Sequence, residues 1–218
     1  MDYSEKVIVL DTETTNSIDD PICYDIGFAV VDYTGKVYET FSFAVADIFL
    51  DKELMSYAYF VDKVPQYWEE IRTGKRQLKR FHTIKSIFRE VCQKYNVNKI
   101  YAHNARFDYR SCTLTQRYLT NSKYRYFFPY GTEIHDTLKM ARTILKNDDN
   151  YGEFCYNYDY LTAKGQRRYT AEIIYRYITG ENDFSEEHKG IDDVLIEKEL
   201  LRYFSSVAPD TESALWSK

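Results

Sequence analysis

The chain has 218 residues, of which 44% are hydrophobic and 29% are charged, and it contains only eight glycines and four prolines. This composition is typical of a folded globular protein and excludes collagen-like and low-complexity chains. The formal net charge of −5 argues against binding to nucleic acid through a broad basic surface, because that binding needs many lysine and arginine contacts with phosphate.

The first part of the chain carries three predicted strands. An apolar run at residues 6–12 predicts the first, and segments rich in β-branched and aromatic residues at 23–32 and 36–45 predict the next two. The short turn at 33–35 indicates that the second and third strands pair as an antiparallel hairpin. Helical spacing of apolar residues then extends over 51–96.

Alternating strands and helices follow. Residues 99–102 predict a short buried strand, and a helix is expected from about Ala105 to near Thr120. A last short strand is predicted at 133–135, after which Asp136 is suited to cap a helix. Two final helices are expected, at 170–179 and 191–204.

This order of elements predicts one α/β domain over residues 1–208, with a flexible tail at 209–218. We expect a mixed five-stranded sheet flanked by helices, in which three antiparallel strands precede the strand–helix units. No apolar run approaches the roughly 18 residues that a membrane span needs, and the acidic, polar start of the chain does not resemble a signal peptide. We therefore expect a cytoplasmic protein with no membrane partner.

Carboxylate side chains stand at three positions where sites form in such folds. Asp11 and Glu13 are two residues apart near the end of the first strand, so both point to the same face. Asp108 follows the short strand at 99–102. Asp193 lies five residues after His188, and the two converge only if His188 lies in the loop before the last helix. Taken singly, such residues are more often solvated groups or helix caps.

Taken together, three segments resemble the motifs of the DEDD exonuclease superfamily: residues 11–15 (DTETT), 102–108 (AHNARFD) and 188–193 (HKGIDD). The histidine spacing is similar to that of the DnaQ-like branch, which includes the proofreading subunit of DNA polymerase III, RNase T and oligoribonuclease. The resemblance implies an RNase H-like sheet. It also implies a metal-dependent 3′-to-5′ exonuclease that releases nucleoside monophosphates from single-stranded or frayed DNA 3′ ends.

The same resemblance implies two bound divalent cations, Mg²⁺ or Mn²⁺, held by four carboxylates: Asp11, Glu13, Asp108 and Asp193. Oxygen ligands favour these hard cations, and four ionised carboxylates without a cation would force at least one to keep its proton. His188 is the implied general base, so activity is expected to rise with pH as His188 loses its proton. Asp192 is the alternative to Asp193, although it would lie about 100° round the helix.

Further residues are candidates for substrate binding by the same resemblance: Thr12, Thr14, His103, Asn104 and Phe107. A purely structural role stays open for each of them, and for His103 that role is to orient the loop of the second motif. The chain has Asn16 where most members have glycine, and asparagine tolerates a left-handed backbone. Residues 43–80 match no substrate-facing loop of the family, so their role is left open.

Two basic clusters stand out against the acidic composition: Arg72, Lys75, Arg76, Lys79 and Arg80, and then Lys164, Arg167 and Arg168. Charge runs are usually solvated surfaces. The alternative is that one cluster guides a single strand towards the metals.

Two other functions remain open at this point. An RNA-directed 3′-to-5′ exonuclease is the nearest, because the motifs do not report contacts to the 2′ hydroxyl. A non-catalytic module that binds a nucleic-acid end or a DNA polymerase is the other, and it has no need of all four carboxylates and the histidine. A polymerase partner and the oligomeric state are left open.

Overall fold

A mixed sheet lies at the centre of the computed structural model, which describes residues 2–123 and 126–208. Within these residues the sheet has six strands in the order β4-β3-β2-β1-β5-β6. Their bounds are β1 Lys6–Thr15, β2 Ile22–Asp32, β3 Val37–Val45, β4 Gln77–Lys79, β5 Lys99–Ala102 and β6 Glu133–Asp136. The tail expected at 209–218 lies outside the described residues.

The strand pairing confirms the mixed α/β fold. β1 pairs with β2, and β2 with β3, in antiparallel orientation, whereas β5 and β6 add in parallel on the other side of β1. The predicted hairpin turn is present, with Gly35 in the left-handed region at φ +84°. The expectation of five strands was wrong by one, because β4 pairs in parallel with the end of β3. β4 has only three residues, too few to show strand alternation in the sequence.

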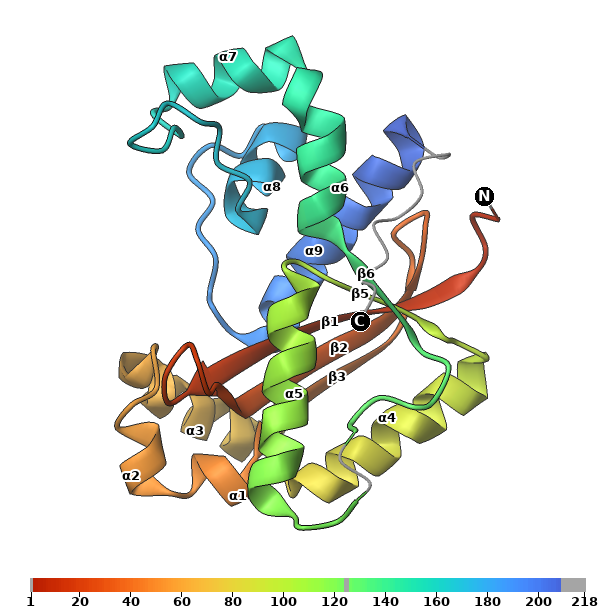
Figure 1. Ribbon diagram of the computed structural model, residues 1–218, viewed down its shortest axis with the longest axis vertical. Helices are drawn as coiled ribbons and strands as arrows, with labels where there is room; N and C mark the ends of the chain where they lie inside the picture. Colours follow the sequence, from red (N-terminus) through yellow and green to blue (C-terminus); the bar gives the residue numbers. More distant parts are fainter. Residues whose placement is uncertain (1, 124–125, 209–218) are drawn as a thin grey trace.

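Helices cover both faces of the sheet (Figure 1). Their bounds are α1 Ala46–Phe49, α2 Lys52–Met55, α3 Val64–Thr73, α4 Phe81–Tyr95, α5 Ala105–Leu119, α6 Thr137–Ile144, α7 Asp149–Asn157, α8 Ala171–Thr179 and α9 Gly190–Val207, with 3-10 turns η1 Val61–Lys63 and η2 Leu145–Asn147. The helical segment predicted at 51–96 is interrupted, because Gly74 ends α3 in the left-handed conformation. α7 was not predicted; the Asp148 side chain caps it by accepting from two backbone amides.

The alternation of β1 builds two hydrophobic layers. Ile8 and Leu10 face the layer that contains α4 and α5. Val7 and Val9 face the opposite layer, formed with α6 to α9. Figure 1 shows these two groups of helices on opposite sides of the sheet. β1 is therefore buried on both faces. Each fully buried aliphatic side chain contributes about 1.5–3 kcal/mol to the stability of the fold, so β1 is held firmly in place.

In the part of the chain that the structure describes, no helix is both long enough and apolar enough to span a bilayer.

Candidate active site

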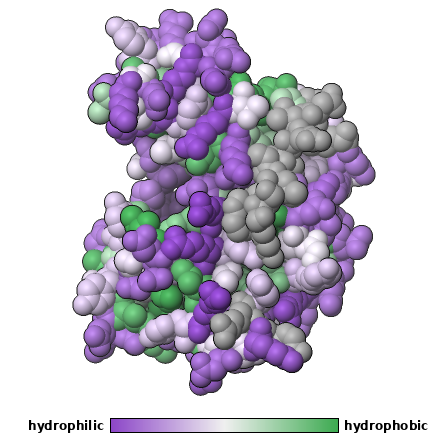
Figure 2. Space-filling model, viewed as in Figure 1, coloured by the Kyte–Doolittle hydropathy of each residue, from purple (hydrophilic) through white to green (hydrophobic). Residues whose placement is uncertain are grey.

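The end of β1 carries the first two carboxylates. Asp11 and Glu13 both line a cavity of about 1190 Å³, as the strand alternation predicts. Directly after Glu13 a bulge shifts the register with β2. Thr14 follows this bulge, and it is not among the residues that line the cavity. Figure 2 shows this face of the molecule hollowed between an upper and a lower part, with hydrophilic residues around the hollow.

The third carboxylate comes from the first turn of α5. That helix starts after Asn104, which takes the left-handed conformation at φ +71°. The Asp108 side chain is 3% exposed and lines the same cavity. The Thr12 hydroxyl donates to Asp108 Oδ1 over 2.9 Å, so this side chain orients the carboxylate. Burial raises the pKa of Asp108 to about 8.

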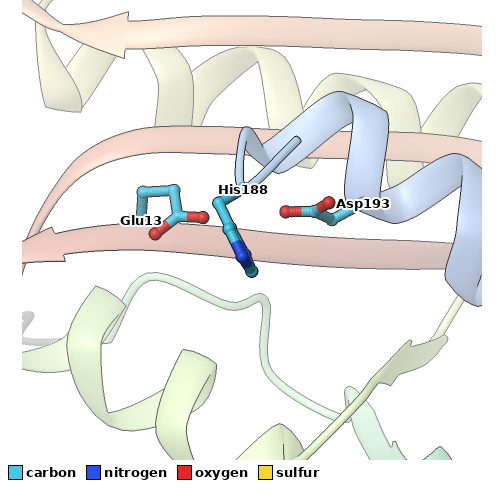
Figure 3. A group of neighbouring side chains, drawn as sticks. All are labelled: Glu13, His188 and Asp193. Carbon is cyan, nitrogen blue, oxygen red and sulfur yellow. The ribbon is translucent and has the colours of Figure 1, made fainter. Parts of the chain in front are cut away.

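His188 and the fourth carboxylate come together where α9 begins. His188 lies in the preceding loop at φ +49°, and Asp193 lies in the first turn of the helix. One ring nitrogen of His188 and single carboxylate oxygens of Glu13 and Asp193 all lie within 4.8 Å of one another. Figure 3 shows the two carboxylates directed toward each other, with the imidazole between them. The spacing of five residues therefore gives the convergence that the sequence predicts.

Asp192, the alternative ligand, faces away from this cluster. Its carboxylate lies 3.5 Å from Lys75 Nζ and 3.7 Å from Lys189 Nζ. It is not among the residues that line the cavity, whereas Asp193 is. The geometry therefore favours Asp193.

Two glycines let α9 start directly against the sheet. A Cβ atom on Gly27 of β2 would lie 2.3 Å from the carbonyl carbon of Gly190, and one on Gly190 would lie 2.8 Å from the Gly27 nitrogen. Both distances are shorter than real side chains allow. The Gly190 amide donates to Asp25 Oδ2 over 3.0 Å, so the helix start is also hydrogen-bonded to β2.

Asp25 belongs to a buried polar network that the sequence did not reveal. It accepts from the Tyr67 hydroxyl over 2.7 Å and from the Arg76 guanidinium. Arg76 also donates to Glu70 Oε2 over 2.9 Å, and Lys189 Nζ donates to Glu70 Oε1 over 2.9 Å. Residues 43–80 therefore hold the start of α9 through the helix α3 and the residues that follow it.

This network corrects the interpretation of the first basic cluster. Arg76 is 1% exposed, so neither a solvated surface nor a strand-guiding role applies to it. Lys75 Nζ lies 3.5 Å from Glu70, and Arg72 pairs with Glu69. The run of cations at 72–80 could not show this in the sequence, because the partner of Arg76 on β2 becomes a neighbour only in the fold.

The carboxylates raise one another's proton affinity. Burial, with the negative charge of Asp11, raises the pKa of Glu13 to about 11. Burial and Asp11 likewise raise the pKa of Asp193 to about 9. Asp193 Oδ1 is buried and has no hydrogen-bond partner among the described residues. These crowded carboxylate oxygens, one of which has no partner, are suitable ligands for hard divalent cations. A bound dication would remove the repulsion between the carboxylates.

Two more carboxylates line the cavity, and the sequence analysis missed both. Glu197 is 3% exposed and accepts from the His103 amide over 3.1 Å. Burial and the nearby carboxylates raise its pKa. It lies one helical turn after Asp193, so the spacing of four residues on α9 was the available signal. Glu186 lies in the loop before His188, where burial raises its pKa to about 7, and no pattern pointed to it.

The remaining candidates also belong to the lining of this cavity. His103, Asn104 and Phe107 all line it. His103 Nε2 lies 2.7 Å from the Tyr169 carbonyl oxygen, which can only accept, so Nε2 carries the proton. Its Nδ1 lies 3.1 Å from the Thr137 hydroxyl. Both ring nitrogens are thus used within the protein, which favours the loop-orienting role of His103.

Sequence comparisons find no match, either to a protein-family model or to a curated protein. Solved structures do match. Exonuclease I from Methylocaldum szegediense has a TM-score of 0.62 at 14% identity, and the zinc-bound complex of E. coli ExoI with ssDNA has 0.58 at 15%. S. pombe Pop2p in its Mg²⁺- and Mn²⁺-bound form has 0.51 at 12%. The chain therefore shares its fold with these exonuclease I structures and with Pop2p.

The shared fold extends over nearly the whole chain, because each alignment covers 94% of it. The alignments cover 84% of Pop2p but only 41% of either exonuclease I chain. The chain therefore spans about two fifths of the exonuclease I proteins. The predicted RNase H-like sheet is confirmed, and the assignment to the DnaQ-like branch stays a prediction.

Proposed function

We propose that the protein is a metal-dependent 3′-to-5′ exonuclease that releases nucleoside monophosphates from single-stranded or frayed DNA 3′ ends. The observation that carries this proposal is the convergence of acidic side chains from β1, α5 and α9 with His188 on one cavity. The solved structures of the same fold support it. They include exonuclease I in complex with single-stranded DNA and Pop2p with bound Mg²⁺ and Mn²⁺.

Charge balance supports two cations. Four ionised carboxylates carry −4, and two dications would neutralise them and leave the site able to accept a phosphodiester. The ligands in this proposal are Asp11, Glu13, Asp108 and Asp193. When bound, Mg²⁺ or Mn²⁺ supplies Lewis-acid stabilisation of the phosphoryl oxygens and lowers the pKa of water. The oxygen donors favour these ions over zinc.

The protein's own groups carry out the proton transfer. His188 accepts a proton from the attacking water, whose oxygen forms a bond to phosphorus. The bond between that phosphorus and the 3′ oxygen of the preceding nucleotide breaks, so a nucleoside 5′-monophosphate leaves. Burial, and then the positive charge of Lys63, lower the pKa of His188, which keeps the imidazole neutral and able to accept a proton at pH 7.

The test is incubation of DNA and RNA strands, labelled at either end, with Mg²⁺, Mn²⁺ or chelator. We expect a 3′-labelled DNA strand to release labelled mononucleotide at once, and a 5′-labelled strand to shorten stepwise. Chelator should stop both reactions. A preference for the RNA strands would favour the RNA-directed enzyme.

Matched variants assign the site. Asp193→Asn should abolish turnover, whereas Asp192→Asn, on the neighbouring residue outside the cavity, should retain it. His188→Ala should lower turnover by roughly 10²- to 10⁴-fold, the range for loss of a general base. Full activity in chelator, or in Asp193→Asn, would overturn the proposed function. Normal turnover in His188→Ala would remove only the general-base role.

A further inference from the structure

The cavity has a second wall, opposite in charge to the carboxylates. Leu138, Arg142 and Lys146 line it at intervals of four residues along α6 and η2. Arg168 lines it from the loop between α7 and α8. We call Arg142, Lys146 and Arg168 the cationic wall. The carboxylates and the cationic wall face one shared space that is larger than the roughly 300–1,000 Å³ of a typical small-molecule site.

Among the described residues, the charges of the cationic wall have no counter-ion. All three side chains are exposed, and within the described residues none of them forms an ion pair. This distinguishes them from Arg72 and Lys75, which lie within ion-pairing distance of carboxylates. In a protein of net charge −5, three cations gathered on one cavity wall, with no ion-pair partner among the described residues, favour an anionic ligand.

Hydrogen bonds hold the cationic wall in place. Arg167, beside Arg168, donates through one guanidinium nitrogen to the carbonyl oxygens of Leu145, Lys146 and Asp148, over 2.8, 3.0 and 2.8 Å. This clamp joins the loop that carries Arg168 to the end of η2, which carries Lys146. The Tyr169 carbonyl bonds to His103, which joins the same loop to the start of α5. Arg167 is therefore a structural residue, in contrast to the solvated interpretation of its cluster.

We propose that the cationic wall binds the phosphodiester backbone of a single DNA strand whose 3′ end lies among the carboxylates. This inference rests on the proposed function and adds the residues that contact the strand upstream of the cleaved bond. The carboxylate side cannot attract a polyanion by itself, whereas three unpaired cations can neutralise successive phosphates. Of the second basic cluster only Arg168 takes this role, because Lys164 does not line the cavity and Arg167, which does line it, is engaged by three backbone carbonyls.

The test measures strand binding without turnover. The probe is fluorescein-labelled oligothymidylate of about 12 nucleotides, within the span of single-strand grooves. Its binding is followed by fluorescence anisotropy in chelator across a range of salt concentrations. Each lost phosphate contact should reduce the slope of log affinity against log salt by about 0.7. The triple variant Arg142→Ala, Lys146→Ala, Arg168→Ala should therefore lose about 2 units of slope.

Two control variants have the same charge and nearly the same place in the chain. They are Lys139→Ala on α6 and Lys164→Ala on the α7–α8 loop. Both lysine side chains are exposed and lie outside the cavity. Their salt slopes should equal that of the unmodified protein. Equal slopes and affinities in the triple variant and the unmodified protein would overturn the inference, and so would equal losses in the controls.

A second readout uses turnover with Mg²⁺. The triple variant should raise KM for the long strand and leave kcat unchanged, and it should hydrolyse a thymidine dinucleotide like the unmodified protein. A dinucleotide has no upstream phosphate for the cationic wall. If the unmodified protein hydrolyses nothing while the cationic wall still governs binding, the proposed function fails and this inference stands. Hydrolysis with an unchanged KM in the triple variant overturns this inference alone.

Discussion

The phenyl ring of Phe60 lies face to face with the imidazole of His188, with 4.4 Å between the ring centroids and 8° between the planes. Phe60 comes from the segment directly before η1, and His188 comes from the loop before α9. One face of the imidazole is thereby shielded from water, which contributes to the burial that lowers the pKa of His188. The stack makes Phe60 a positioning residue for the proposed general base.

Phe60→Ala is expected to lower kcat by roughly 2- to 10-fold, because aromatic pairs contribute about 0.5–1.5 kcal/mol. It should also move the acid limb of the pH–kcat profile to higher pH. A more exposed His188 has a higher pKa, so it keeps its proton, and stays unable to act as a base, up to a higher pH. Phe60→Tyr keeps an aromatic ring at this position, so its kcat and its acid limb should match those of the unmodified protein. An unchanged pH profile in Phe60→Ala would contradict the positioning role.

The metal-free protein is expected to lose stability as pH rises. The pKa values of Glu13 (about 11), Asp193 (about 9) and Asp108 (about 8) are raised by burial. Above the ordinary carboxyl pKa, the folded state therefore keeps protons that the unfolded state releases, and the free energy of unfolding falls with pH. Urea unfolding in chelator should show this decline from about pH 4.5, steepest up to about pH 8 and ending only near pH 11, where Glu13 loses its proton in the folded state.

Saturating Mg²⁺ should reverse that decline, since the ion binds the folded, deprotonated site. The gain is about 2.7 kcal/mol when Mg²⁺ is at 100 times its Kd. Asp193→Asn should flatten the decline in chelator and lose most of the Mg²⁺ gain, while Asp192→Asn should keep both. A full Mg²⁺ gain in Asp193→Asn would contradict its assignment as a ligand.

Gly27→Ala is expected to lower activity by disturbing the contact between β2 and the start of α9. The new Cβ would meet backbone atoms of Gly190 and Ile191 at 2.3 Å, so the start of α9 must move. Overpacking of this kind costs roughly 1–3 kcal/mol, and a displacement of about 1 Å at catalytic groups can cost about 100-fold in rate. Urea unfolding and kcat measure the two effects.

Gly131→Ala is the matched control for this change. Gly131 has φ +81° and open space around its Cα, so alanine there adds only local backbone strain of about 1–2 kcal/mol. It should lose stability and retain kcat. If Gly27→Ala retained full kcat at the same loss of stability, the close contact would have no bearing on the site.

Arg76→Met is expected to lower the free energy of unfolding by about 3–5 kcal/mol, because it leaves Asp25 buried without its cation. The double variant Asp25→Asn, Arg76→Met should recover part of this loss, since the unpaired charge is gone. Chemical denaturation of the two variants measures the difference. A double variant less stable than Arg76→Met would show that the Gly190 amide depends on the charge of Asp25.

Local patterns in the sequence were enough to predict most of the fold. Alternation and apolar runs identified β1, β2, β3 and β5, and Asp136 caps α6 as expected, accepting from the Leu138 amide. Asn16 takes the left-handed conformation at φ +71°, as its replacement of glycine suggested. β4 and α7 were missed because a three-residue strand has no period and α7 follows directly on a turn.

Some residues of the site were likewise predictable from the sequence and others were not. That Asp11, Glu13, Asp108 and Asp193 meet His188 at one cavity was predictable, because these residues lie in contiguous motifs whose spacing carries the geometry. Asp25, Arg76 and Phe60 were not, since each acts on a partner far away along the chain. For Arg76 the sequence pattern was misleading, because a cation within a basic run is usually solvated. Only the fold brings Asp25 next to it.

The four proposed metal ligands come from the strand between the two hydrophobic layers and from one helix in each layer. Asp108 belongs to α5 and Asp193 to α9, and these helices pack on opposite faces of β1. Any ion shared by the two would couple the opening of one layer to that of the other. Mg²⁺ should then slow amide hydrogen exchange at the starts of both helices together, and this cross-sheet cooperativity would be absent from the metal-free protein.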